Sequence, residues 1–347
     1  MTPRVATVLS ARDWESGLVA LARETAEVRM VLRAFRPEEV EEEAHRLDVV
    51  VAGAETTWVT PARIATWRRR GLRVVGIFPS GDRPARQRLV AGGADEVLPD
   101  DTPPGAVVRA IRLLRPAAGP AEVPRTATAV VVTGPPGAPG CTEVALALAW
   151  SWAARRRTLL LDLDVEAPSL AVRLGRPPRP DLVDAAEAVH ETGALPASAV
   201  TAYGPFALVV GSTRRADGTL PAHLVDDVAA AACCLADLVV ADAGARPGGD
   251  SLVKAADRVV LVAEASPTGL VRAARLTAEW AGPQPSLVLN RVHPAQADEV
   301  VAAARRWLGL DPAALVPWRE AVAAAGRAAR PPAAPLRRAV RRLEPTP

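Results

Sequence analysis

Lysine is nearly absent from this chain of 347 residues, because 41 of its 42 basic residues are arginines and Lys254 is the only lysine. Aromatic residues make up only 3 % of the chain, so aliphatic side chains must form most of the core. Arginine-rich sequences with abundant alanine and proline are typical of GC-rich genomes. The number of arginines alone is therefore weak support for a nucleic-acid-binding face.

The sequence has few cysteines, little net charge and no long apolar run. Its three cysteines, with Cys233 and Cys234 adjacent, provide no disulfide framework. A net charge of +3 is too small to indicate a nucleic-acid partner. No apolar run approaches the roughly 18 residues of a membrane span, and the first residues enter a predicted strand without a secretory signal. We therefore expect a cytoplasmic protein.

The length allows two domains that each bury a core. Residues 115–125 are rich in proline, alanine and glycine, which is typical of a linker. We predict domains at 1–115 and 127–347, joined by a linker at 116–126.

In the N-terminal half, short β-branched runs alternate with helical stretches. The runs at 5–9, 49–52, 73–77 and 96–98 predict strands, and 15–23, 61–70, 83–91 and 104–114 predict helices. Such alternation favours a parallel α/β sheet.

The stretch Gly-Ala-Asp-Glu-Val-Leu at 93–98 resembles the last strand of a response-regulator receiver domain, which is flavodoxin-like. A receiver needs an aspartate to accept the phosphoryl group, but the third strand ends in Gly53 at that position. Ser10 stands where the family has Mg²⁺-binding acids, and Asp100 stands at the family's lysine position. We therefore predict a pseudo-receiver domain used for docking. An unrelated small α/β domain is the alternative.

A glycine-rich loop at 134–143 follows an apolar strand at 129–132 and opens a helix rich in alanine and leucine. Strand, glycine-rich turn and helix in this order predict a nucleotide-binding P-loop. Such a loop uses a lysine before its closing threonine to reach the β- and γ-phosphates. Cys141 occupies that position here, before Thr142.

Four further landmarks follow the loop in order. A strand ends in Asp162 with Asp164 two residues later, a second ends in Asp242, a third spans 256–262, and the last continues into Asn290. Together with the loop, they resemble the MinD/ParA family of deviant P-loop ATPases. The domain order resembles the CpaE-like branch, and in particular its actinobacterial septum site-determining (Ssd) group. The resemblance implies a second parallel α/β sheet of the P-loop NTPase type.

The resemblance also implies roles for individual residues. The family loop, K-G-G-x-G-K-T, aligns with residues 136–142, so both family lysines are missing. The aligned candidates are Gly137, Gly140, Cys141 and Thr142 for the phosphates, Asn290 for adenine, Asp162 and Asp164 for catalysis, and Asp164 and Asp242 for Mg²⁺.

The loop is poorly equipped to bind phosphate, which requires backbone N–H groups and a cationic side chain. Pro135, Pro136 and Pro139 lack an N–H, Cys141 is neutral, and Glu143 adds a carboxylate that we expect to repel phosphate. Losing two charge-assisted hydrogen bonds, each worth roughly 1.5–3 kcal/mol, lowers affinity by about 10²–10⁴. We expect weak ATP/Mg²⁺ binding at best and little or no ATPase activity. Cys141 is either a small filler residue or a reactive thiol.

At the C-terminus, Leu336, Val340 and Leu343 share one helical face among arginines. MinD proteins end in a membrane-seeking amphipathic helix, but three modest apolar residues favour a helix packed on its own domain. Any membrane association should be peripheral.

The resemblance implies a non-catalytic or weakly nucleotide-responsive regulator of septum sites or of a Tad/Flp pilus-secretion apparatus. Such a protein would dock on protein partners of that machinery, as a monomer or homodimer, and be recruited to membrane or septum. One alternative is an active MinD-like ATP-dependent dimeric switch. Another is a ParA-like DNA-partitioning protein, although dispersed arginines predict no specific nucleic-acid binding.

Overall fold

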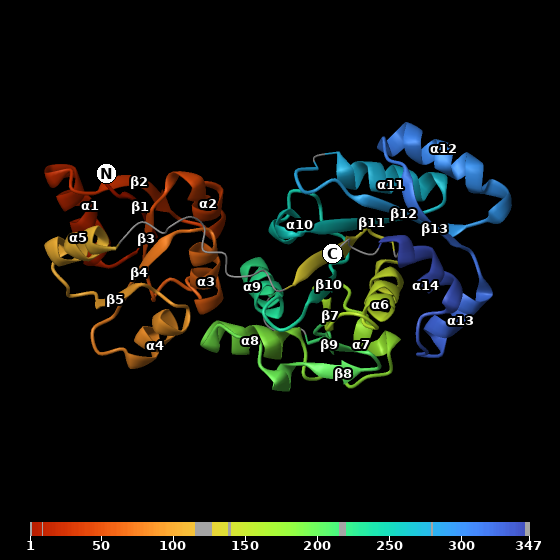
Figure 1. The fold of residues 1–347 in the computed structure, drawn as a ribbon, viewed down its shortest axis with the longest axis horizontal. Helices are drawn as coiled ribbons and strands as arrows, with labels where there is room; N and C mark the ends of the chain where they lie inside the picture. The colour runs from red at the N-terminus through yellow and green to blue at the C-terminus, as the bar shows by residue number, and fades with distance from the viewer. Residues whose placement is uncertain are drawn as a thin grey trace. The chain divides into compact units, whose positions relative to one another are not determined.

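The computed structural model describes residues 2–8, 10–114, 127–137, 140–214, 220–278 and 280–343 (Figure 1). The chain divides into two compact units, one containing residues 1–124 with 187–194 and the other 125–186 with 195–347. Each unit contains one β-sheet. The predicted linker at 116–126 lies outside the described residues, so its boundaries stay a prediction.

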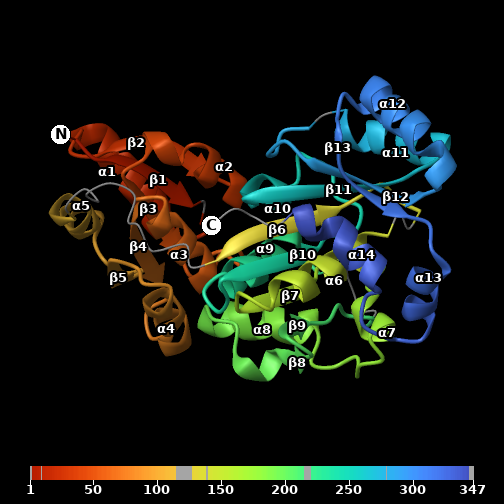
Figure 2. The same cartoon turned by 45° about the vertical axis from the view of Figure 1, so that its right-hand side comes forward.

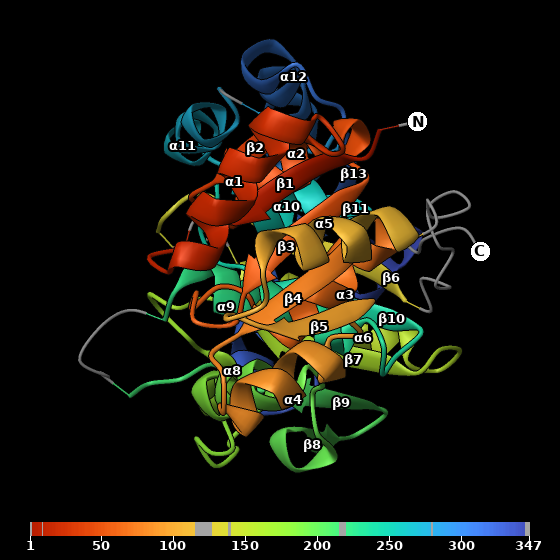
Figure 3. The same cartoon turned by 90° about the vertical axis from the view of Figure 1, so that its left-hand side faces the viewer.

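The sheet of the first unit has the strand order β2-β1-β3-β4-β5, and all its strand pairs are parallel (Figure 3). This is the flavodoxin-like order. The elements are β1 (Arg4–Val8), α1 (Asp13–Thr25), β2 (Arg29–Ala34), α2 (Pro37–Glu42), β3 (Val49–Gly53), α3 (Pro61–Arg69), β4 (Arg73–Phe78), α4 (Arg83–Ala91), β5 (Glu96–Pro99) and α5 (Pro104–Leu113).

Burial on both faces explains the composition of this sheet. All five residues of β3 are buried, as expected for a central parallel strand. One core cluster includes Trp14 and Ile111, and a second includes Ile64 and Trp67. The sequence did not predict β2, because it is an edge strand with exposed arginines and therefore lacks a continuous apolar run.

The sheet of the second unit has the order β13-β12-β11-β6-β10-β7-β9-β8 (Figure 1). Only its β8–β9 pair is antiparallel among the described strands. The elements are β6 (Thr128–Thr133), α6 (Cys141–Trp152), β7 (Thr158–Asp162), α7 (Leu170–Arg173), α8 (Leu182–Thr192), β8 (Thr201–Tyr203), β9 (Phe206–Val209), α9 (Ala222–Ala232), β10 (Leu238–Asp242), α10 (Ser251–Ala255), β11 (Arg258–Glu264), α11 (Pro267–Thr277), β12 (Ser286–Val292), α12 (Ala297–Leu308), β13 (Pro312–Pro317), α13 (Glu320–Arg327) and α14 (Ala334–Val340). Helix α8 is divided between the units, because its residues from 187 onward belong to the first.

The core of this unit surrounds α6, whose residues 144–149 are all fully buried. Helix α14 packs on α6, and Leu336, Val340 and Leu343 belong to the same core cluster (Figure 2). These three side chains therefore do not form an exposed apolar face. Within the described ranges, no helix is both long and apolar enough to span a bilayer.

Candidate functional site

The loop after β6 lies at the carboxyl edge of the second sheet. Strand β6 pairs with β10 and β11, so their carboxyl ends meet beside this loop. Gly137 has φ of 109° and Gly140 has φ of 102°, and Gly140 caps the N-terminus of α6. These left-handed backbone conformations favour glycine. Residues 138 and 139, and with them the predicted effect of Pro139, lie outside the described residues.

Thr133, the last residue of β6, joins the start of the loop to the segment after β10. Its hydroxyl oxygen lies 2.9 Å from the carbonyl oxygen of Gly244 and 3.0 Å from that of Arg246. It also accepts the N–H of Arg246 at 3.0 Å. Gly134 N–H donates to the Gly244 carbonyl at 3.1 Å. These contacts hold the loop and the post-β10 segment in one arrangement.

Asp162 and Asp242 end the neighbouring strands β7 and β10 and stand side by side in the strand register. Both are buried. Asp162 accepts the N–H groups of Ser169 and Leu170, each at 2.9 Å. Burial nevertheless raises the pKa of Asp162 to about 6. This carboxyl group is therefore held mainly by backbone donors and is partly protonated near pH 6.

The charged form of Asp242 is less well stabilised than that of Asp162. Neither of its carboxylate oxygens accepts a hydrogen bond of normal geometry within the described residues, although the Thr142 hydroxyl and the Gly244 N–H favour its charged form. Burial, with the charge of Asp162, raises the pKa of Asp242 to about 7. A buried carboxylate without a firm partner is a position where a cation or a proton is favoured.

The remaining predicted loop residues contact this acidic pair or its neighbours. The Thr142 hydroxyl hydrogen-bonds with the Ser169 hydroxyl at 2.8 Å. Asp164 accepts the N–H groups of Glu166 and Ala167, and its carboxylate packs so closely on Gly244 that a side chain at 244 would overlap it. The Asp164 carboxylate therefore accepts hydrogen bonds from its own loop and also contacts the segment after β10.

Cys141 is buried at the first position of α6. Burial, with the charges of Asp242 and Asp164, raises the pKa of its thiol well above the usual value. A protonated buried thiol is a poor nucleophile. The structure therefore favours the interpretation of Cys141 as a filler residue over a reactive thiol.

Glu143 does not face the loop as an isolated charge, as the sequence suggested. The Arg173 guanidinium pairs with both of its carboxylate oxygens, and that arginine side chain is only 8 % exposed. Because its charge is matched, Glu143 repels an incoming phosphate less than expected.

Asn290 lies in β12, and its side chain reaches the loop. The amide nitrogen packs against Gly140 where any Cβ would overlap it, and the amide oxygen accepts the Arg291 N–H at 2.9 Å. The structure thus places Asn290 at the loop and gathers Cys141, Thr142 and the acids around Asp242. The roles of Ser169, Thr133 and Arg173 could not be predicted from local sequence, because their contacts are long-range.

The residues present fit only part of a Mg²⁺-nucleotide site. The poorly partnered Asp242 carboxylate, beside the Thr142 hydroxyl, suits the cation side. Among the residues that the structure describes, however, no group of three or more His, Cys, Asp or Glu side chains is placed to hold a metal. The loop itself supplies no cationic side chain, so its phosphate side does not fit the family pattern.

In the first unit, the position expected for a phosphoacceptor is filled by another side chain. The Glu55 carboxylate folds over Gly53, where any side chain would overlap it. It accepts the Ser10 hydroxyl and the Trp14 indole N–H, the latter at 3.3 Å. Asp100 pairs with Arg12. Residue 53 therefore offers no carboxylate for phosphorylation.

Known structures resemble the fold of about 64 % of the chain. No family model and no curated protein matches the chain. Among solved structures, it is similar to the MinC:MinD cell division complex of Aquifex aeolicus, with a TM-score of 0.52, 16 % identity and coverage of 64 % of this chain and 98 % of that chain. The MinD protein of the same organism matches with a TM-score of 0.50, 18 % identity and coverage of 64 % and 99 %.

These similarities confirm an α/β fold of the MinD-like P-loop ATPase type, and at such identities they show the fold alone. The receiver domain of the putative response regulator NarL from Mycobacterium tuberculosis also matches, with a TM-score of 0.29, 22 % identity and coverage of 32 % of this chain and 94 % of that chain. The pseudo-receiver prediction itself rests on the sequence and on the strand order of the first sheet.

Proposed function

We propose that this protein is a regulatory or localisation protein of the CpaE/MinD-like type. It acts in septum-site determination or in positioning a Tad/Flp pilus-secretion apparatus, and it is non-catalytic or only weakly responsive to nucleotide. The observation that carries the proposal is the buried Asp242 carboxylate beside the neutral Cys141, on a MinD-like fold. The fold is retained, while the cationic half of the nucleotide site is missing.

Electrostatics supports this proposal. A nucleotide triphosphate brings several negative charges to a loop beside Asp162, Asp164 and Asp242. Mg²⁺ offsets only part of that charge, and the loop has no lysine to offset the rest. Since a charge-assisted hydrogen bond contributes roughly 1.5–3 kcal/mol, the native loop should bind Mg-ATP far more weakly than a loop with both lysines.

In this proposal the protein works by docking. Its two α/β units present surfaces to protein partners of the division or secretion machinery, in the cytoplasm, with peripheral recruitment to membrane or septum. Complementary charge would steer these encounters. A fluorescent fusion in the native host should concentrate at division sites or at the secretion apparatus. Uniform fluorescence with no septation or secretion defect on deletion would contradict the proposal.

The biochemical test is calorimetric titration with Mg-ATP of the native protein and of a Pro136→Lys/Pro139→Val/Cys141→Lys variant. We expect no micromolar binding by the native protein and binding by the variant, because the substitutions restore two cations and two backbone N–H groups. Micromolar binding and turnover of ATP by the native chain would overturn the proposal.

An ATP-dependent dimeric switch is the second candidate, favoured by the placement of Asn290 against Gly140 and by the retained acids. It requires a dimer that forms only with Mg-ATP. Light scattering with and without Mg-ATP separates the two functions, because a docking protein keeps one oligomeric state in both conditions.

A further inference from the structure

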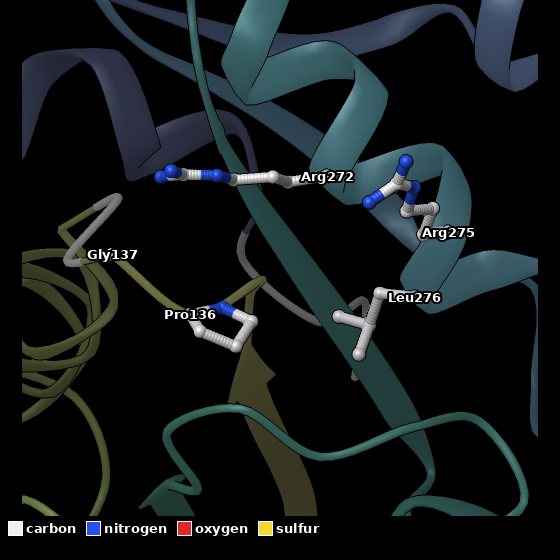
Figure 4. A pocket seen from close by; sticks show the side chains of 5 residues that line it. All are labelled: Pro136, Gly137, Arg272, Arg275 and Leu276. Atoms are coloured by element: carbon white, nitrogen blue, oxygen red, sulfur yellow. The ribbon is translucent and has the colours of Figure 1, made fainter.

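A cavity of about 530 Å³ lies between the loop and helix α11 (Figure 4). Pro136 and Gly137 line it from the loop, and Arg272, Arg275 and Leu276 line it from α11. Neither member of the buried acidic pair, Asp162 and Asp242, lines it. Its volume lies within the range of small-molecule sites, and its described lining carries two positive charges and no negative one.

The Arg272 guanidinium lies close to the backbone of Gly137 in the loop. Its guanidinium lies so near Gly137 that a Cβ at that position would be 2.5 Å from Nη1. Gly137 also has φ of 109°, which a side chain would rarely adopt. In Figure 4 the Arg272 side chain extends from α11 toward Gly137. The absence of a side chain at 137 therefore creates the space that the guanidinium uses.

Arg275 follows Arg272 by three residues on the same helix face. Within the described part of the chain, neither guanidinium has an ion pair or a hydrogen bond, whereas Arg291 nearby in sequence pairs with Glu264. Both arginines are exposed, so an anion that enters the cavity would meet two guanidinium groups that no acid of the described residues neutralises. Guanidinium groups bind phosphate oxygens with paired N–H donors, so phosphate is the anion that this geometry suits.

We propose that Arg272 and Arg275 form a phosphate-binding pair that takes the phosphate groups of a nucleoside diphosphate or triphosphate without Mg²⁺. The pair supplies from α11 the positive charge that the loop lacks at Pro136 and Cys141. This inference rests on the proposed function, because it gives a weakly nucleotide-responsive protein its point of contact with nucleotide. Pyrophosphate has the same phosphate chemistry and could occupy the pair without a nucleoside.

The test is calorimetric titration of the full chain with pyrophosphate, ADP and ATP, each in EDTA at low salt, where electrostatic binding is strongest. We expect binding that Arg272→Gln and Arg275→Gln each weaken at least tenfold. Arg306→Gln, an exposed arginine on α12 outside this lining, should leave it unchanged. Equal affinity for pyrophosphate and ADP would show that the protein recognises the phosphates alone. Tighter binding of ADP would show added contacts to the nucleoside.

Absence of binding to all three ligands would overturn the inference, and so would Arg272→Gln binding as tightly as the native protein. Equal weakening by Arg306→Gln would also overturn it, because the effect would then reflect net charge. Circular dichroism and thermal unfolding of each variant exclude misfolding. Localisation and ATP turnover test the proposed function separately, so either proposal can fail while the other stands.

Discussion

At the scale of single residues, the exchange of a lysine position for Cys141 changes the ionisation of the acids around it. A lysine there would favour the charged form of Asp242. With a neutral thiol, burial dominates, and the pKa of Asp242 rises to about 7 and that of Asp162 to about 6. These raised values mean that the folded state binds protons more tightly than the unfolded chain.

A raised folded-state pKa contributes stability below the unfolded pKa and loses it as pH rises through the folded value. We therefore expect Asp242→Asn to stabilise the protein at pH 8 by about 4 kcal/mol, because the pKa of Asp242 rises from 3.8 to about 7 and each pKa unit is worth roughly 1.4 kcal/mol. At pH 5, nearer the ordinary pKa of 3.8, the same variant should stabilise the protein by only about 2 kcal/mol. Urea unfolding at both pH values measures the difference.

The matched control is Asp237→Asn. Asp237 forms an exposed ion pair with Arg157, and hydrogen bonds from Arg157 lower its pKa. The stability that this pair contributes is therefore lost as pH falls. Its substitution should not stabilise the protein at pH 8. If Asp242→Asn destabilised the protein equally at both pH values, the buried carboxylate would instead be a net stabilising group.

The cysteines provide a second prediction at this scale. Cys141 is buried with a raised pKa, whereas Cys234 is exposed. We expect iodoacetamide to modify Cys234 and leave Cys141 unmodified in the folded protein, as read by peptide mass spectrometry. Full labelling of both in urea is the control. Rapid modification of native Cys141 would revive the reactive-thiol interpretation.

At the scale of elements, α14 is part of the core. Leu336 is 1 % exposed and packs in the cluster around α6. Leu336→Ala should lower the free energy of unfolding by about 2–5 kcal/mol, the usual range for a buried leucine. Arg338→Ala, on the exposed side of the same helix, should change it by less than about 0.5 kcal/mol. Denaturant unfolding measures both, and equal small effects would mean that α14 detaches readily.

Local patterns predicted those elements whose buried residues recur with the period of a helix or a strand. Strand β3 was predicted from its apolar run and helix α3 from a helical stretch, and the structure adds that Thr60 caps α3. The edge strand β2 was missed because its charged residues interrupt the run. Short elements such as α2 were missed because their stability comes from tertiary contacts, including the pairing of Glu41 with Arg63.

The same division applies to the candidate site. Asp162, Asp242 and Asn290 were predicted from the resemblance of their strands to those of the MinD/ParA family, and their roles stay a prediction. The pairing of Glu143 with Arg173 and the approach of Arg272 to Gly137 were not predictable, since each joins distant segments. Local sequence carries no signal for contacts of that kind.

At the scale of the whole molecule, ion pairs neutralise the charge of many arginines. Many arginines pair with acids on the same unit, among them Arg4, Arg33, Arg73, Arg157, Arg179, Arg214 and Arg246. With a net charge of only +3, such pairing leaves little positive field for a polyanion.

We therefore expect no specific DNA binding and only a shallow salt dependence of any residual binding. Fluorescence anisotropy with duplex DNA at several salt concentrations measures the slope of log K against log salt. A slope steeper than about −5, equivalent to five or six phosphate contacts, would favour the DNA-partitioning alternative. Binding that disappears at physiological salt would agree with the docking function.

The carboxylate of Glu55 lies over Gly53 and fills the space that a side chain at residue 53 would enter. An aspartate at residue 53 would have to displace this carboxylate, which is the end of a flexible side chain and can move aside. The cost would be the loss of the Glu55 hydrogen bonds to Ser10 and Trp14. A phosphoacceptor at residue 53 would therefore be gained only by giving up these contacts.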